Sequence, residues 1–130
     1  MSFTRPDLPR LRHAVGAYAA RLGVVGPRRG ALLLAVNEVT DNVIRHAGGR
    51  GRLCLYREGR SVRCRVADDG PGFDLARVLG TAPDPARATG WGLWTVRELM
   101  DGLGVAPAHA HAPGPDAGRG AVVTLTVTLI

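Results

Sequence analysis

The chain has 130 residues, of which 45% are hydrophobic and 22% charged, and these values are ordinary for a single globular domain with one core. All 17 basic residues are arginine, and the formal net charge is +6. The absence of lysine excludes a P-loop lysine, the strand lysine of eukaryotic protein kinases and a Schiff-base lysine. An excess of arginine suits a polyphosphate ligand, an acidic partner or a nucleic acid equally well.

The cysteine count and the hydropathy pattern set further limits. Cys54 and Cys64 are too few for a disulfide framework or a four-ligand zinc site. The first seven residues lack the apolar core of a signal peptide, and no stretch approaches about 18 uninterrupted apolar residues. We therefore expect a cytoplasmic protein without a membrane span.

Two helices are predicted at the start of the chain. From Asp7 to about Leu22, apolar residues recur at spacings of three and four, which predicts an amphipathic helix that ends at Gly23. Its predicted apolar face consists of Leu8, Leu11, Val15, Tyr18 and Leu22. A second helix is predicted from about Pro27 to Ala47, where two glycines stop it.

A β-hairpin is predicted next. Residues Arg52–Arg57 and Arg60–Asp68 alternate in polarity, and Glu58-Gly59 suits a two-residue turn between them. This turn predicts that Leu53 lies opposite Cys64. The two cysteines then face opposite sides of the hairpin, so that a bridge between them is not expected.

The remaining elements complete an α+β pattern. We expect a short helix from about Trp91 to Met100, a short strand near Val105, a loop from Ala106 to Gly120 and a last strand from Ala121 to Leu129. The order predicts a single domain, residues 1–130, built as a two-layer α/β sandwich. Its helices are expected to cover one face of a mostly antiparallel sheet.

The second helix carries a row of polar residues beside its apolar stripe. The stripe, predicted to face the core, consists of Leu32, Val36, Val39, Val43 and Ala47, and the residues predicted to face solvent are Asn37, Asp41 and Arg45. Glu38, Asn42 and His46 lie between the two faces at successive turns. An Asn carbonyl oxygen can bind Mg²⁺, and a Glu can accept a proton or orient a water. The alternative is a helix edge with incidental polar residues.

The hairpin ends in a carboxylate followed by a glycine turn. By the period of the strand, Asp68 points to the same side as Val66 and is buried, and burial of a charge requires hydrogen-bond donors. A backbone amide, a water or a ligand amino group, such as that of adenine, would supply them. Gly70 and Gly72 allow the backbone to approach a ligand closely, although the same residues also suit a plain turn.

A second glycine turn, Gly90-Trp91-Gly92, opens the short helix. The first amides of a helix are free to bind an anion such as phosphate, although a lone Gly-x-Gly is a weak signal. The segment from Leu75 to Thr89 links the two glycine turns and is predicted to be a lid over the space between them.

In combination, these motifs resemble the ATP-binding fold of gyrase, heat-shock chaperone ATPases, histidine kinases and mismatch-repair ATPases, the GHKL or Bergerat fold. The resemblance covers about residues 8 to 129. Within this superfamily the chain is most similar to the small anti-sigma factor serine kinases of bacteria. The segments that carry this similarity are Leu34–Ala47 and Gly92–Leu99, together with the short lid.

The resemblance implies a role for each matching residue. Asn42 would ligate Mg²⁺, Glu38 would be the general base, and Asp68 would recognise the adenine amino group of ATP. The remaining nucleotide-binding residues that the resemblance implies are His46, Ala47, Gly70, Gly72, Gly90, Gly92 and Leu93.

The resemblance also implies partners and an activity. Such kinases phosphorylate a serine of an anti-anti-sigma protein of the STAS fold and bind a sigma factor, usually as dimers. The family's first strand, often used in dimerisation, is expected to be short or missing, because few residues precede Asp7. Three alternatives remain: a non-catalytic switch module that uses ATP or ADP to set its shape, a detached histidine-kinase-like ATPase domain, and an arginine-rich nucleic-acid binder. No nucleic-acid-binding motif supports the last, so direct binding of nucleic acid is not expected.

Overall fold

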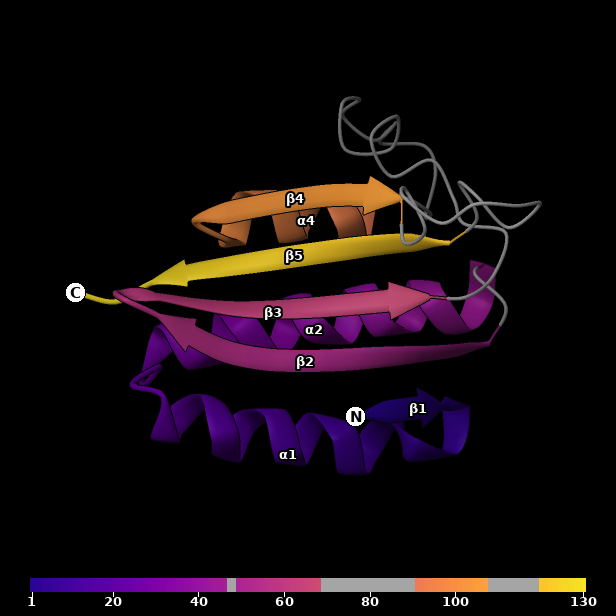
Figure 1. Ribbon diagram of the computed structural model, residues 1–130, viewed down its shortest axis with the longest axis horizontal. Coiled ribbons are helices and arrows are strands. Elements are labelled where there is room, and N and C mark those ends of the chain that lie inside the picture. The colour runs from indigo at the N-terminus through magenta and orange to yellow at the C-terminus, as the bar shows by residue number, and fades with distance from the viewer. Residues whose placement is uncertain (47–48, 69–90, 108–119) are drawn as a thin grey trace.

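The computed structural model describes residues 1–46, 49–68, 91–107 and 120–130. Its strands are β1 (Ser2–Thr4), β2 (Arg50–Glu58), β3 (Ser61–Asp68), β4 (Gly102–Pro107) and β5 (Ala121–Thr128), in the sheet order β1-β2-β3-β5-β4. Its helices are a 3₁₀ turn (Arg5–Asp7), α1 (Leu8–Arg21), α2 (Pro27–His46) and α4 (Trp91–Leu99). Every strand pair is antiparallel within the described residues, and in Figure 1 α2 and α4 lie behind the sheet while α1 lies along its β2 side. The predicted α+β sandwich is confirmed.

The core lies between the sheet and the helices. The predicted stripe of α2 is confirmed at Leu32, Val36, Val39 and Val43, each at most 1% exposed. Ala47, the fifth member of the stripe, lies outside the described residues. Across from α2, alternate residues of β2, β3 and β5 are buried, as the period of a strand with one covered face requires.

The solvated face predicted for α2 is only partly correct. Arg45 is exposed, whereas Asn37 and Asp41 are half-buried. The helix is central in its layer, because α1 packs against one side of it and α4 against the other. A helical wheel assumes one buried face, and here the neighbouring helices also cover the flanks.

The hairpin register differs from the prediction by two residues. Leu53 pairs with Val66 rather than with Cys64, and the turn is Gly59-Arg60. Gly59 has a φ of 61° at the first central position of the turn, where a type II′ turn needs a positive φ and therefore favours glycine. A shift of two keeps every side chain on its predicted face, so Cys64 is buried and Cys54 exposed.

Of two predictions about the N-terminal region, one is confirmed and one needs correction. The first strand is short, as one of the two expected alternatives had it, because β1 has only three residues, which pair with Arg50–Arg52. Tyr18, predicted on the buried face of α1, is 44% exposed. Figure 1 gives the reason, because α1 lies along the edge of the sheet beyond β2 and only part of its apolar face meets the core.

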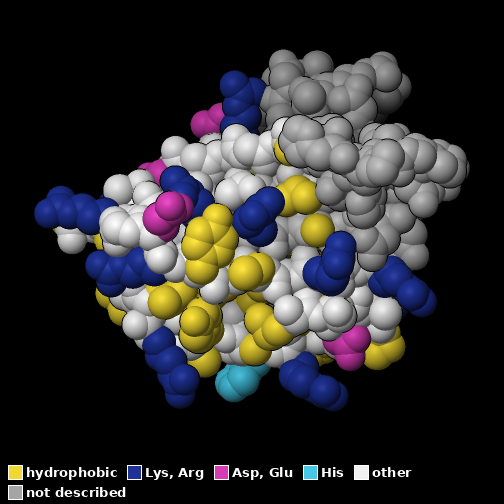
Figure 2. All heavy atoms as spheres, in the orientation of Figure 1, with side chains coloured by type: hydrophobic (Ala, Val, Ile, Leu, Met, Phe, Trp, Pro, Cys, Tyr) yellow, Lys and Arg dark blue, Asp and Glu magenta, His cyan; other side chains and the backbone are white. Residues whose placement is uncertain are grey.

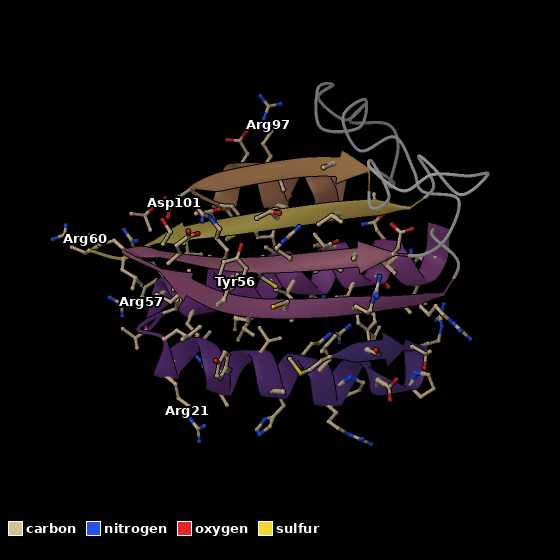
Figure 3. All side chains as sticks on the ribbon, in the orientation of Figure 1. Arg21, Tyr56, Arg57, Arg60, Arg97 and Asp101 are labelled. Carbon is tan, nitrogen blue, oxygen red and sulfur yellow. The ribbon has the colours of Figure 1, made fainter. Side chains whose placement is uncertain are left out.

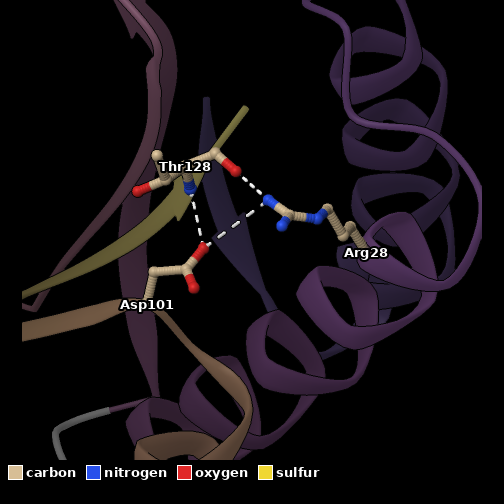
Figure 4. A network of polar contacts seen from close by, with 3 residues as sticks. All are labelled: Arg28, Asp101 and Thr128. Atoms are coloured by element: carbon tan, nitrogen blue, oxygen red, sulfur yellow. Dashed lines mark hydrogen bonds and ion pairs between the residues drawn. The ribbon is translucent and has the colours of Figure 1, made fainter. Parts of the chain in front are cut away.

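A polar network holds the end of the sheet where β5 stops (Figure 4). The Asp101 carboxylate accepts a hydrogen bond from the Thr128 backbone N–H at 2.7 Å. Arg28, in the first turn of α2, donates to the Thr128 carbonyl oxygen and lies 3.9 Å from Asp101. The network ties α2, β4 and β5 together at their common end.

Candidate functional site

Four elements end or begin at one end of the sandwich. In Figure 1 the end of β3, the C-terminal turn of α2, the beginning of α4 and the beginning of β5 all lie at the right-hand side. Asn42 lies in the C-terminal part of α2, Asp68 is the last residue of β3 and Gly92 is in the first turn of α4, so all three belong to elements that end or begin here. The described members of the three predicted motifs therefore lie toward one end of the sandwich.

Asp68 is the last residue of β3, and its side chain points into the protein. It is 1% exposed, and its Oδ2 accepts a hydrogen bond from the Ala121 backbone N–H at 3.0 Å. The predicted inward orientation is confirmed, and the donor is one of those predicted, a backbone amide. Because Ala121 opens β5, the carboxylate is fixed between the end of one strand and the start of its neighbour.

A close contact between β1 and β2 lies beside this carboxylate. Gly51 is the cross-strand partner of Asp68 on one side and of Phe3 on the other. A Cβ atom on Gly51 would lie 2.7 Å from the Phe3 ring and 2.9 Å from the Ala67 carbonyl oxygen. Glycine is therefore required here for packing, and the buried Phe3 ring occupies the space that a side chain would need.

On α2, Asn42 and Glu38 form consecutive steps of the predicted ladder. Both are half-buried, and the Asn42 Nδ2 donates a hydrogen bond to the Glu38 carbonyl oxygen at 2.7 Å. This bond involves the Nδ2 amino group of the amide. The Oδ1 carbonyl oxygen is therefore the atom through which Asn42 can ligate a cation. The donor chemistry therefore fits a magnesium ligand at this position. His46 is the last residue of α2, and its side chain is not described.

The glycine motifs are described only in part. Gly70, Gly72, Gly90 and the predicted lid, residues 75–89, lie outside the described residues. Gly92 and Leu93 belong to the first turn of α4, which begins at Trp91. The backbone amides of such a turn have no partner within the helix, and an anion can accept hydrogen bonds from them.

Sequence reasoning missed three residues around Asp68: Phe3, Gly51 and Ala121. Two of them act through backbone or through the absence of a side chain, so no side-chain chemistry marked them. The signal that was available is the glycine at position 51, which interrupts an alternating strand and indicates a close approach of another group.

The match to a protein family shows the class of this domain. The chain matches the family of histidine kinase-like ATPase domains over residues 2–126, and it belongs to that family. Among curated proteins, no relative matches the chain. Within the described residues, no helix has both the length and the apolar character needed to cross a membrane.

Similar solved structures support the same fold. The mycobacterial sensor histidine kinase MprB has 17% identity and a TM-score of 0.62, with coverage of 98% of this chain and 96% of that one. A chain of the SiaB–SiaC complex from Pseudomonas aeruginosa has 16% identity and a TM-score of 0.66, with coverage of 98% and 89%. The histidine kinase AdeS of Acinetobacter baumannii has 18% identity and a TM-score of 0.53, with coverage of 78% and 47%.

Proposed function

We propose that this protein binds Mg-ATP and transfers its γ-phosphoryl group to a serine or threonine of a partner protein, acting as an anti-sigma-type regulator. The observation that carries the proposal is the buried carboxylate of Asp68, held by the Ala121 amide at the end of the sandwich where α2 ends and α4 begins. Membership of the histidine kinase-like ATPase family supports the nucleotide. The SiaB–SiaC complex, a similar structure that contains two proteins, supports a protein partner.

The proposal gives each residue a specific task. Asp68 would accept a hydrogen bond from the adenine amino group, and Asn42 would hold Mg²⁺ through Oδ1. The amides of Gly92 and Leu93 would donate to phosphate oxygens. Glu38 would accept the proton of the attacking hydroxyl. Bound Mg²⁺ would neutralise the charge that develops on the phosphates.

We further propose the partners that the family resemblance implies. The phosphorylated partner would be an anti-anti-sigma protein of the STAS fold, and the regulated partner a sigma factor. A homodimer would present two such sites. The protein would act in the cytoplasm, and nucleic acid would not be bound directly.

Calorimetry with ADP and Mg²⁺ tests the nucleotide step. Asp68→Asn keeps an oxygen for the Ala121 amide but replaces the acceptor that faces adenine, so about 1.5–3 kcal/mol of charge-assisted hydrogen bonding is lost. The affinity for ADP should therefore fall about 10- to 150-fold, and that for GDP should change little. Asp41→Asn is the matched control, because Asp41 pairs with Arg45 on α2. Equal loss of ADP and GDP binding in Asp68→Asn would refute the adenine role.

Transfer of label from γ-labelled ATP to a purified STAS protein tests the kinase step. We expect transfer with the wild type and none with Glu38→Gln, while Glu38→Gln still binds nucleotide. If nucleotide binds and no label moves with the wild type, the protein is a non-catalytic switch module. If label moves to a histidine, the protein works as a histidine-kinase-type ATPase domain, an alternative that the likeness to MprB supports.

A further inference from the structure

The edge of β2 is only partly covered by another strand. β1 pairs with Arg50–Arg52, and the backbone N–H and C=O of Leu53 both bond to Met1, at 2.7 and 2.8 Å. In the part of the chain that the structure describes, no strand pairs with the next stretch of this edge, Cys54–Glu58. Because alternate residues of a strand direct their backbone groups to the same side, Leu55 and Arg57 present theirs here. The uncovered edge is about 16 Å long at the usual rise per residue.

An apolar hollow lies on α1 beside Met1, the residue that bonds to β2 just before the uncovered edge. It has a volume of about 390 Å³ and is lined by Met1 and by one side of α1, through Ala14, Ala17, Tyr18 and Arg21. Met1 and Tyr18 are 55% and 44% exposed, so the hollow presents large apolar side chains to solvent. In Figure 1 the uncovered part of β2 and the second half of α1 lie side by side, and Met1 marks where they begin. We call these residues together with Cys54–Glu58 the β2–α1 surface.

The charges around the β2–α1 surface are mostly positive. Helix α1 contains three arginines and no acidic residue. On the uncovered face of the sheet, Arg63 is paired with Glu58, and the exposed Arg65 adds further positive charge. Figure 2 shows hydrophobic side chains gathered over this part of the molecule with arginines around them. Figure 3 shows Tyr56 on the sheet face and Arg57, Arg60 and Arg21 toward one end.

We propose that the β2–α1 surface binds an extended, acidic segment of a partner protein as an added strand. The segment would continue the line of β1 and bond to the backbone of Leu55 and Arg57, a recognised mode of peptide binding at a sheet edge. Alternate side chains of an added strand point to opposite faces. One set of these side chains would enter the hollow beside Tyr18 and would therefore be apolar. The other set would lie on the arginine-rich face of the sheet and would therefore be acidic.

The charge pattern favours such a partner over a second copy of this chain. Two copies that met through this surface would bring like charges together, since Arg21 at the hollow and the exposed Arg57 of β2 would lie near their counterparts in the other copy. This proposal does not depend on the nucleotide site, because none of the residues of the β2–α1 surface belongs to it. Its failure and the failure of the proposed function are therefore distinguishable.

Two labelled peptides of ten residues test the proposal on the full chain, one alternating valine with glutamate and one alternating valine with lysine. Fluorescence anisotropy should show binding of the glutamate peptide that weakens with salt, and at least tenfold weaker binding of the lysine peptide. Amide hydrogen exchange at Leu55 and Arg57 should slow on binding. Equal binding of both peptides, binding of neither, or unchanged exchange at both amides would overturn the proposal.

Substitutions on α1 provide the matched comparison. Tyr18→Asp and Ala17→Asp place a charge in the hollow and should each weaken binding of the glutamate peptide at least tenfold. Ala20→Asp adds the same charge at an exposed position that does not line the hollow and should change affinity less than twofold. Equal effects of all three would overturn the proposal. A dimer in sedimentation velocity that Tyr18→Asp dissociates would also overturn it, because the surface would then belong to a second copy.

Discussion

Gly51→Ala tests whether packing between β1 and β2 supports the region around Asp68. The added Cβ would lie 2.7 Å from the Phe3 ring, where ordinary van der Waals contact begins at 3.4 Å. The ring cannot move into solvent, because Phe3 is 2% exposed and lies in the core. The Ala67 carbonyl oxygen, 2.9 Å from the same Cβ, belongs to the backbone of β3 and has little freedom to shift. Overpacking of this kind costs about 1–3 kcal/mol.

Urea denaturation measures this cost, and Gly104→Ala is the matched control. Gly104 lies in β4, and a Cβ added there would have no neighbouring atom within 4 Å, so its replacement should change the free energy of unfolding by less than about 0.5 kcal/mol. Phe3→Ala alone should destabilise by about 3–5 kcal/mol. The double substitution should be less destabilising than the sum, because the ring that clashes is gone. A Gly51→Ala protein as stable as the wild type, or additive effects with Phe3→Ala, would refute the packing argument.

Three further predictions concern the other end of the sheet and the cysteines. Asp101→Ala removes the acceptor for the last amide of β5 and should lower the free energy of unfolding by about 1 kcal/mol in urea denaturation, with unchanged ADP affinity. Burial raises the pKa of the Cys64 thiol to about 12, so iodoacetamide at pH 8 should modify Cys54 alone, as read by mass spectrometry. The neutral thiol of Cys64 stabilises the folded state below pH 9, and this contribution is lost as the pH rises toward 12. Thermal melts should therefore show a smaller loss of stability over that window for Cys64→Ala than for the wild type.

The parts of the fold that follow from periodicity could be predicted from the sequence. The stripe of α2 and the inward orientation of Asp68 depend only on helix and strand periods, and both are confirmed. The hairpin register failed because both candidate turns contain Gly59, which can have a positive φ at either central position, and only the pairing of β2 with β3 shows which position it occupies. The exposure of Tyr18 depends on where α1 lies relative to the edge of the sheet. The periodicity of one helix does not specify this position.

The candidate site was predictable where side chains carry the chemistry and not where backbone does. The spacing of Glu38 and Asn42 predicts that they lie on successive turns of one helix edge, and the hydrogen bond that orients the Asn42 amide follows from the same spacing of four. The donor to Asp68 is a backbone amide more than 50 residues away, and every non-proline residue has one. Its identity depends on the pairing of β3 with β5, a long-range contact that no local pattern specifies.

The polar groups at the two ends of the sandwich find their hydrogen-bond partners in different ways. At one end the connections satisfy their own polar groups: a two-residue turn joins β2 to β3, and Asp101 accepts the hydrogen bond from Thr128. At the other end, β3 stops, β5 starts, and α4 presents first-turn amides that have no partner within the helix. Backbone N–H groups without a partner in the helix need an acceptor, and in the proposed nucleotide site the phosphate oxygens would supply it. Substitutions at the Asp101 end should therefore change stability without nucleotide affinity, whereas those at the Asp68 end should change nucleotide affinity.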